Sequence, residues 1–223
     1  MSRSVLAERI AGLYRSRFLR GYVRAKIASD PLYAAVAERL RDGPLPILDI
    51  GCGVGLMEFY LRESGCVQPM LGLDHDEGKI REAQRVAASR YAGLTFEAAD
   101  ACLPLDGGSS VLLLDLLHYL RDDQQRELLE RVADGVPPGG SVIVRDGIRD
   151  GSWRYRFTFA AEEFARLVRW LKADKLNFPR LASILEPFAA RGFAAEVVPM
   201  WGGTPFNNYL FVFKREASGT MKS

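Results

Sequence analysis

Cysteine and histidine are scarce in this sequence, and their scarcity excludes several kinds of site. The three cysteines, Cys52, Cys66 and Cys102, are an odd number without C-x-x-C spacing, and there are only two histidines. Neither a disulfide framework nor a zinc site is favoured by such a set. We therefore expect no bound metal and a reduced, cytoplasmic setting.

Long apolar runs and a large excess of charge of one sign are also missing. No run of about 18 apolar residues is present, so neither a transmembrane helix nor a membrane partner is expected. Arginines interrupt the N-terminal segment, which therefore lacks the apolar core of a signal peptide. A formal net charge of +2 gives no electrostatic reason to expect a nucleic-acid partner. The length of 223 residues suits one α/β domain and leaves the oligomeric state open.

The stretch 47–55, Ile-Leu-Asp-Ile-Gly-Cys-Gly-Val-Gly, organises the predicted fold. Its apolar residues predict a buried strand, and its three glycines allow the backbone to bend sharply against a ligand. Apolar residues from Leu56 onwards recur with helical spacing. A strand, a glycine turn and a helix N-terminus together predict a site for a nucleotide-like ligand.

Apolar runs alternate with helical patterns through the middle of the chain. We predict five successive strands separated by helices or loops, at 46–50, 69–73, 94–98, 111–114 and 141–144. This alternation is typical of a doubly wound, Rossmann-like α/β sheet that is mostly parallel. Two more strands, 195–198 and 209–213, are joined by a connection too short for a crossover helix, so we expect an antiparallel C-terminal hairpin.

Helical and aromatic segments flank the predicted sheet. An amphipathic helix over residues 4–27, broken near Gly21, and a second at 31–41 are predicted as N-terminal cap helices. Aromatic residues and arginines alternate over 153–159, which we interpret as an extended segment with one of the two sets facing inward. A loop at 103–108 and helices at 77–90, 122–132, 161–172 and 179–190 complete the prediction.

Acidic residues lie at or near the carboxyl ends of the first three predicted strands. These ends form one rim of a parallel sheet, where ligands bind. Asp74, about 20 residues beyond the glycines, is placed to accept both hydroxyls of a ribose. Asp100 could accept from an exocyclic amine, and Asp49 could orient the glycine loop or meet a ligand cation. Each acid could instead cap the next helix or turn.

The glycine spacing argues against two common nucleotide sites. A dinucleotide fingerprint has glycine at its sixth position, where this chain has Leu56. A P-loop is excluded because no Gly-Lys-Ser or Gly-Lys-Thr is present after the glycines. An acidic loop suits a ligand whose middle carries a cation rather than a pyrophosphate.

At these residues the chain resembles the class I S-adenosylmethionine (SAM)-dependent methyltransferases. The resemblance covers about 47–144 and is most specific at 49–55. Asp74 matches the ribose-binding acid, Asp100-Ala101 the adenine-side motif, and 114–120 the segment that touches the methionine moiety. The resemblance implies SAM as cofactor. The candidate cofactor-binding residues are Asp49, Gly51, Cys52, Gly53, Gly55, Asp74, His75, Asp100, Ala101, Asp115 and Leu116.

The domain prediction rests on the same resemblance. A single methyltransferase domain is expected over residues 1–223. It would consist of N-terminal helices at 1–43, a SAM-binding core at 44–146, an inserted helical acceptor region at 147–193 and a closing β-hairpin at 194–215.

Methyl transfer to a hydroxyl requires a base that takes the proton of the attacking oxygen. His118 is the leading candidate because histidine titrates near neutrality, although it could instead pack beside SAM. Asp146, at the carboxyl end of the fifth strand, is the second candidate. His75, beside the ribose acid, is expected to touch the adenosine or the solvent.

Residues outside the resemblance are expected to form the acceptor site. Aromatic side chains offer flat apolar surface and arginines could bind a carboxylate or phosphate, although the aromatics could equally be the core of the added helices. We predict a small, partly apolar acceptor that is methylated on oxygen in preference to nitrogen or carbon. The candidate substrate residues are Arg24, Trp153, Arg156, Trp201 and Asn207.

Two other functions remain open from the sequence. One is a catalytically silent, methyltransferase-like binding subunit that serves a partner. The other is a nicotinamide-dependent oxidoreductase, against which Leu56 counts because the fingerprint has glycine there.

Overall fold

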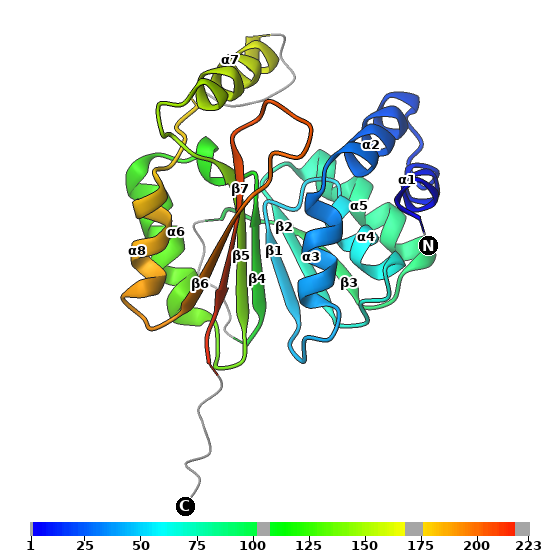
Figure 1. Cartoon of the computed structure of the whole chain (residues 1–223). Helices are drawn as coiled ribbons and strands as arrows, with labels where there is room; N and C mark the ends of the chain where they lie inside the picture. Colours follow the sequence, from blue (N-terminus) through cyan, green and yellow to red (C-terminus); the bar gives the residue numbers. More distant parts are fainter. Residues whose placement is uncertain (1, 102–107, 168–175, 217–223) are drawn as a thin grey trace, which may run out of the picture. The chain divides into compact units, whose positions relative to one another are not determined.

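The computed structural model describes residues 2–101, 108–167 and 176–216, apart from the side chains of 165–167. The chain divides into two compact units, Met1–Ala101 and Cys102–Ser223 (Figure 1). The predicted loop at 103–108 lies almost wholly outside the described residues, as does the end of the helix predicted at 161–172. The single domain with four parts stays a prediction.

Three parallel strands form the sheet of the first unit. β1 (Ile47–Ile50) pairs with β2 (Met70–Asp74), and β2 pairs with β3 (Leu94–Ala98). The predicted strands are confirmed to within one residue at each end. Asp74 is therefore the last residue of β2, and the glycine loop comes directly after β1.

Several helices of the first unit begin at capping side chains. One predicted boundary is wrong: residues 4–27 form two helices, α1 and α2, and Gly21 lies inside the second. The break comes earlier because Gly12 ends α1 and the Ser16 hydroxyl accepts a hydrogen bond from the amide of Leu19. The bounds are α1 (Arg3–Ala11), α2 (Arg17–Ser29), α3 (Leu32–Leu40), α4 (Leu56–Glu63) and α5 (Glu77–Arg90).

The second unit contains the strand order β4-β5-β7-β6. β4 (Ser110–Leu114) is parallel to β5 (Ser141–Gly147), whereas β7 (Asn208–Lys214) is antiparallel both to β5 and to β6 (Ala194–Pro199). The predicted antiparallel hairpin is thus confirmed, and β5 continues three residues further than predicted. With the order β3-β2-β1 in the first unit, this is a mostly parallel, Rossmann-like α/β fold, as predicted.

The extended segment predicted at 153–159 is wrong, because these residues begin a helix. The Ser152 hydroxyl accepts from the amide of Tyr155 at 3.1 Å and starts the helix. The alternation of aromatic and arginine residues therefore does not separate two faces of a strand. The second unit contains η1 (Leu117–Tyr119), α6 (Asp122–Gly135), α7 (Trp153–Leu167) and α8 (Leu181–Ala189).

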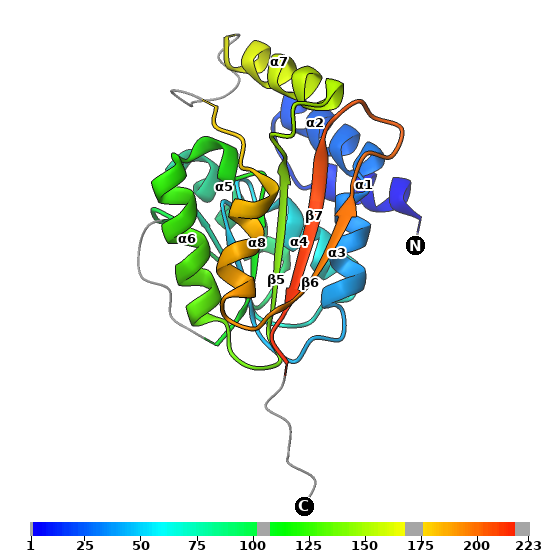
Figure 2. The same ribbon diagram turned by 60° about the vertical axis from the view of Figure 1, so that its left-hand side comes forward.

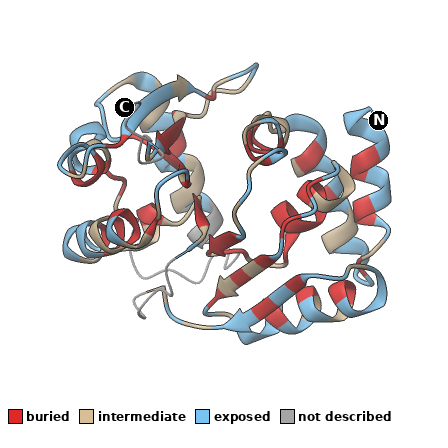
Figure 3. Ribbon diagram, turned by 90° about the horizontal axis from the view of Figure 1, so that it is seen from below, coloured by how far each residue is buried: buried red, intermediate tan, exposed pale blue. Residues whose placement is uncertain are grey.

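Buried apolar residues are concentrated on β1, β4, β5 and β7 and on one side of the helices, whereas β6 is mostly exposed (Figure 3). Within the second unit, α6 and α8 lie side by side in Figures 1 and 2. Among the described residues, no helix has the length and apolar character needed to cross a membrane.

Candidate functional site

The glycine loop after β1 is shaped by three positive φ angles. Gly51, Gly53 and Gly55 have φ values of 90°, 60° and 78°, a backbone conformation that favours glycine. A Cβ at Gly55 would lie 2.8 Å from the Phe96 ring, whereas a Cβ at Gly53 would meet no atom within 4 Å. The loop is thus closely packed at Gly55 and leaves room for a ligand at Gly53.

Asp74 contacts this loop directly. Its Oδ2 accepts from the amide of Gly53 at 2.9 Å, and its Oδ1 accepts from the amide of Asp76 at 2.8 Å. A carboxylate has about four acceptor sites, so capacity for ligand hydroxyls remains. His75 lies beside it, with Nδ1 3.5 Å from Asp74 Oδ1, and its side chain is largely exposed. The structure therefore brings the predicted ribose acid and the glycine loop together.

Asp49 is buried beside a second carboxyl group that the sequence analysis missed. Glu58 on α4 is fully buried, and Asp49 is 2% exposed. Burial and the nearby Asp74 raise the pKa of Asp49 to about 7, although a hydrogen bond with Glu58 acts in the opposite direction. Burial, followed by the Asp49 charge, holds the pKa of Glu58 well above its ordinary value. The available signal was an acid inside the otherwise apolar run Leu-Met-Glu-Phe-Tyr-Leu.

Tyr14 is another residue at the loop that was missed. It lies between α1 and α2, is almost fully buried, and donates its hydroxyl to the carbonyl of Val54 at 3.1 Å. The N-terminal helices are thereby connected to the glycine loop. No pattern in the sequence distinguished this tyrosine from the apolar residues around it.

The other candidates of the first unit are less directly placed. Cys52 is buried, and burial raises the pKa of its thiol, which favours the uncharged form. Asp100 is exposed and Ala101 is half-buried. Arg24 is exposed on α2 and forms an ion pair with Glu8 of α1. The roles predicted for these residues stay predictions.

The second unit contains a buried His118–Asp146 pair. Nδ1 of His118 lies 2.7 Å from Oδ1 of Asp146, and Asp146 also accepts from the amide of Gly147 at 2.8 Å. The imidazole stacks on Phe178 at 5.1 Å between ring centroids. Among the described residues, Nε2 of His118 has no hydrogen-bond partner. The two predicted catalytic residues are therefore in direct contact.

Opposing effects act on the His118 imidazole. Burial lowers its pKa, but the carboxylates of Asp146, Asp115 and Glu162 outweigh burial, so the net shift is upward. Asp115 has a φ of 57°, uncommon for a residue other than glycine. Its carboxylate pairs with the buried Arg145 guanidinium. This pair fixes the turn from β4 through the half-buried Leu116 to η1, which carries His118.

Comparison with known proteins identifies the segment that carries the glycine loop. Residues 47–140 match the family model described as a methyltransferase domain. This segment is therefore similar to the SAM-dependent methyltransferases. Trans-aconitate 2-methyltransferase of Sinorhizobium fredii is 31% identical over 102 residues, which are 45% of this chain and 37% of that protein. The chain thus spans little more than a third of that relative's length.

Two further comparisons extend over most of this chain. Ubiquinone biosynthesis O-methyltransferase of Rhizobium rhizogenes is 28% identical over 184 residues, 80% of this chain and 69% of the relative. The crystal structure of magnesium protoporphyrin IX methyltransferase from Synechocystis PCC 6803 with bound SAH (S-adenosylhomocysteine) has a TM-score of 0.66 at 19% identity. It covers 95% of this chain and 94% of that one. At this identity the structural likeness supports the fold.

The residues of the first unit fit the family's cofactor, SAM. The open space at Gly53 admits a ligand against the loop backbone. Asp74 is bonded to the same residue and has acceptor capacity for ribose hydroxyls. Apart from the contact with Glu58, the buried Oδ1 of Asp49 has no hydrogen-bond partner among the described residues, as suits a group close to a ligand. Within the described chain, no cluster of His, Cys, Asp and Glu side chains could hold a metal ion.

The candidate acceptor residues of the chain divide into exposed and buried residues. Trp153 and Arg156 on α7 are exposed. The Arg154 guanidinium lies 4.7 Å from the ring centroids of both Trp153 and Trp201. Asn207 is buried and donates its Nδ2 to the carbonyl of Ile148 at 2.8 Å. Asn207 thus packs inside the second unit, whereas Trp153 and Arg156 are accessible.

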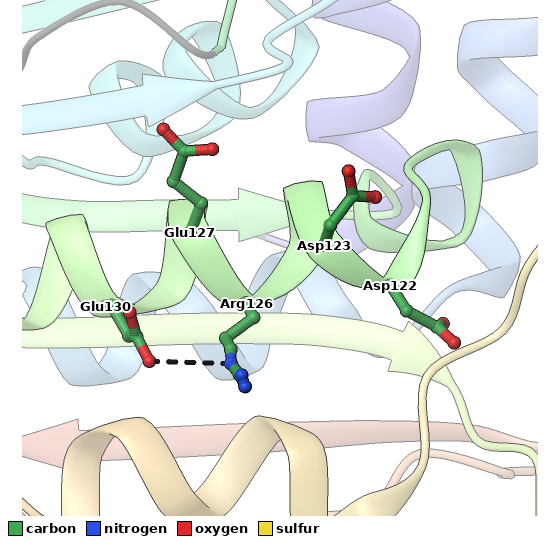
Figure 4. A pocket seen from close by; sticks show the side chains of 5 residues that line it. All are labelled: Asp122, Asp123, Arg126, Glu127 and Glu130. Atoms are coloured by element: carbon green, nitrogen blue, oxygen red, sulfur yellow. Dashed lines mark ion pairs between the residues drawn. The ribbon is translucent and has the colours of Figure 1, made fainter.

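A surface hollow on α6 lies apart from these candidates in sequence. It is lined by Asp122, Asp123, Arg126, Glu127 and Glu130 (Figure 4). Arg126 and Glu130 form an ion pair at 3.7 Å. All five residues belong to one helix and none is a predicted site residue, so we assign the hollow no function.

Proposed function

We propose that this protein transfers a methyl group from SAM to an oxygen of a small, partly apolar acceptor and releases S-adenosylhomocysteine. The observation that carries the proposal is the His118–Asp146 pair. A carboxylate binds Nδ1 of the imidazole, which favours the tautomer with its lone pair on Nε2. That nitrogen is buried and has no other partner among the described residues, as a general base for a hydroxyl requires.

The roles of the individual residues are proposed from their contacts. SAM supplies an electrophilic methyl group on a sulfonium. Asp74 would hold the ribose hydroxyls, and the loop backbone at Gly53 would lie against the cofactor. Nε2 of His118 would take the proton of the acceptor hydroxyl, and Asp146 would stabilise the imidazolium that forms. Alignment of the reactants contributes about 7–11 kcal/mol in the most favourable intramolecular reactions.

The acceptor class is proposed from the accessible part of α7 and from the relatives. Trp153 is 63% exposed and offers a flat apolar surface, and the exposed Arg156 could pair with a carboxylate. The names of the three relatives refer to trans-aconitate, ubiquinone biosynthesis and magnesium protoporphyrin IX. These names support a small-molecule acceptor. The buried free thiols Cys52 and Cys66 support a cytoplasmic setting.

The test combines binding with turnover. Calorimetry with SAM and S-adenosylhomocysteine should show binding of both compounds, and NAD should give no heat. Methyl-labelled SAM should then transfer label to phenolic or carboxylic acceptors and not to the matched amines. Transfer only to RNA or protein would refute the small-molecule assignment. SAM binding without transfer to any acceptor class would favour the silent subunit.

A further inference from the structure

A row of three residues crosses the sheet of the first unit beneath the glycine loop. Gly72 of β2 is the register partner of both Asp49 of β1 and Phe96 of β3. Register partners in parallel strands project their side chains from the same face of the sheet. Gly72 has no side chain, so the row has a gap between Asp49 and Phe96.

The carboxyl group of Glu58 fills this gap. A Cβ built on Gly72 would lie 2.5 Å from Oε1 of Glu58 and 2.7 Å from the Phe96 ring. Any larger residue at this position would therefore displace the carboxyl group. Glu58 is fully buried and Asp49 is 2% exposed, so the two acids lie next to each other away from solvent.

Most carboxyl oxygens of Asp49 and Glu58 receive no hydrogen bond from the other described residues. Apart from their contact with each other, Oδ1 of Asp49 and both carboxyl oxygens of Glu58 have no hydrogen-bond partner there. The titratable groups that act on the pair from neighbouring elements are Asp74 on β2, Cys52 in the loop and Tyr14 between α1 and α2. None of these groups is a cation. Two ionised carboxylates at such a place would repel each other, so a proton between them is the available donor.

We propose that Glu58 is a positioning residue of the cofactor site, which holds a proton and donates it in a hydrogen bond to Asp49. Asp49 then changes its charge state when the cationic cofactor binds. This inference rests on the proposed function, with SAM as the cofactor, and on the expectation from the sequence that Asp49 meets the cation of SAM. The only bond that breaks is the O–H bond of the Asp49 carboxyl group. Asp49 loses its proton to the buffer, and Glu58 keeps its own.

The proposal predicts how cofactor affinity depends on pH. With an Asp49 pKa of about 7, much of the free protein carries a neutral Asp49 at pH 6. A bound cation favours the carboxylate, so SAM binding releases a proton there. The affinity for SAM should rise by up to roughly tenfold per pH unit below neutrality and level off above it.

Calorimetry in buffers of different ionisation enthalpy measures the released proton. SAM should release close to one proton at pH 6 and none at pH 8.5. 5′-Methylthioadenosine, which lacks the sulfonium and the amino acid group, should release none at either pH. Asp49→Asn should abolish the release seen with SAM. SAM affinity that is independent of pH would overturn this proposal and leave the proposed function intact, whereas no SAM binding at any pH would overturn the proposed function.

Two substitutions at Glu58 separate a proton donor from a packing residue. Glu58→Gln keeps a donor beside Asp49 and should retain the wild-type pH profile within about threefold. Glu58→Leu keeps an apolar side chain but removes the donor, so the pH at which affinity levels off should move upward and affinity at pH 7 should fall about tenfold. Equal profiles for the two variants would overturn the proposal.

Infrared spectroscopy gives a readout that does not depend on the cofactor. The free protein at pH 8.5, where Asp49 is ionised, should show the C=O band of a buried protonated carboxylic acid. Glu58→Gln should lose this band while its thermal melt stays cooperative. Retention of the band in this folded variant would show that the proton is elsewhere.

Discussion

Nδ1 of His118 lies 2.7 Å from Oδ1 of Asp146, and both side chains are buried in the second unit. The contact determines which ring nitrogen can act as a base, because the proton stays on the nitrogen that faces the carboxylate. It also stabilises the charged imidazolium. A packing histidine needs neither property, so the pair can be tested by its effect on turnover and on pH dependence.

His118→Asn should lower kcat for methylation of a phenolic hydroxyl by about 10²–10⁴ while SAM affinity changes little. The amide keeps a polar group of similar size but cannot accept a proton at neutral pH. Steady-state kinetics and calorimetry on the same preparation test this expectation. Normal turnover in the variant would remove His118 as the base.

Asp146→Asn should shift the acidic limb of the rate profile to lower pH. The Asp146 charge opposes the effect of burial on the pKa of His118, so its removal lets that pKa fall. Because the base must be neutral, kcat/KM rises with pH through the pKa of His118 and then levels off. The plateau should be lower in the variant because the imidazolium loses its carboxylate. If the acidic limb of the kcat/KM profile lies at the same pH in the variant and the wild type, the titrating group is not His118.

Asp74→Ala should weaken SAM binding by on the order of 100-fold, because charge-assisted hydrogen bonds to the ribose are lost. Asp74 also accepts from Gly53 and Asp76, so some loss of stability is expected as well. Asp76→Ala is the matched control. It removes the α5 cap at Gly78 and should cost about 1 kcal/mol of stability with SAM affinity unchanged. Equal effects of the two variants on affinity would mean that Asp74 acts only through folding.

Much of the fold could be predicted because its elements have strong local signals. The strands of the first unit are short apolar runs with glycines or acids at their ends, and the connection before Asn208 is too short for a helix. The segment after Ser152 was predicted wrongly because its period-2 pattern is real but does not decide its backbone. A capping hydroxyl started a helix there, and side-chain alternation did not reveal it.

The candidate site likewise contains residues that could be predicted from the sequence and residues that could not. Asp49 and Asp74 could be found because they stand at strand ends beside a glycine loop. Glu58 and Tyr14 could not be assigned, because their significance depends on contacts across the fold. Only the pairing of Gly72 with Asp49 shows that there is space beside Asp49 for the carboxyl group of an acid on α4. Sequence spacing predicts which element comes after a strand, but it does not predict which side chain fills a gap between strands.

Alanine substitutions in the glycine loop should separate folding from ligand binding. Gly55→Ala places a methyl group 2.8 Å from the Phe96 ring and should destabilise the protein by several kcal/mol. Gly53→Ala meets no atom within 4 Å, so its cost is about 1–2 kcal/mol for the positive φ. SAM affinity should nevertheless fall at least tenfold in Gly53→Ala, because the methyl group occupies the space for the ligand. Unfolding in urea and calorimetry measure the two effects, and unchanged affinity in Gly53→Ala would place the cofactor elsewhere.

The stability of the free protein should depend on pH through Asp49. An aspartate in the unfolded chain ionises near 3.8, whereas burial raises the pKa of Asp49 to about 7 in the fold. The folded state therefore holds this proton more tightly, and the contribution of Asp49 to stability decreases as pH rises from about 4 to 7 and is constant above. The loss has a ceiling of about 4 kcal/mol, since one pKa unit corresponds to about 1.4 kcal/mol. The asparagine in Asp49→Asn cannot ionise. The free energy of unfolding of this variant, measured in urea, should therefore increase relative to that of the wild type as pH rises over this range.

The exposed Glu38 on α3 provides a matched surface control for this measurement. Glu38→Gln should follow the wild type at each pH, whereas Asp49→Asn should diverge from it up to pH 7 and then run parallel. A constant difference between Asp49→Asn and the wild type from pH 4.5 to 8.5 would show that Asp49 keeps one charge state throughout. The paired carboxyl groups would then have no part in coupling protons to folding, because a group that does not titrate cannot make stability depend on pH.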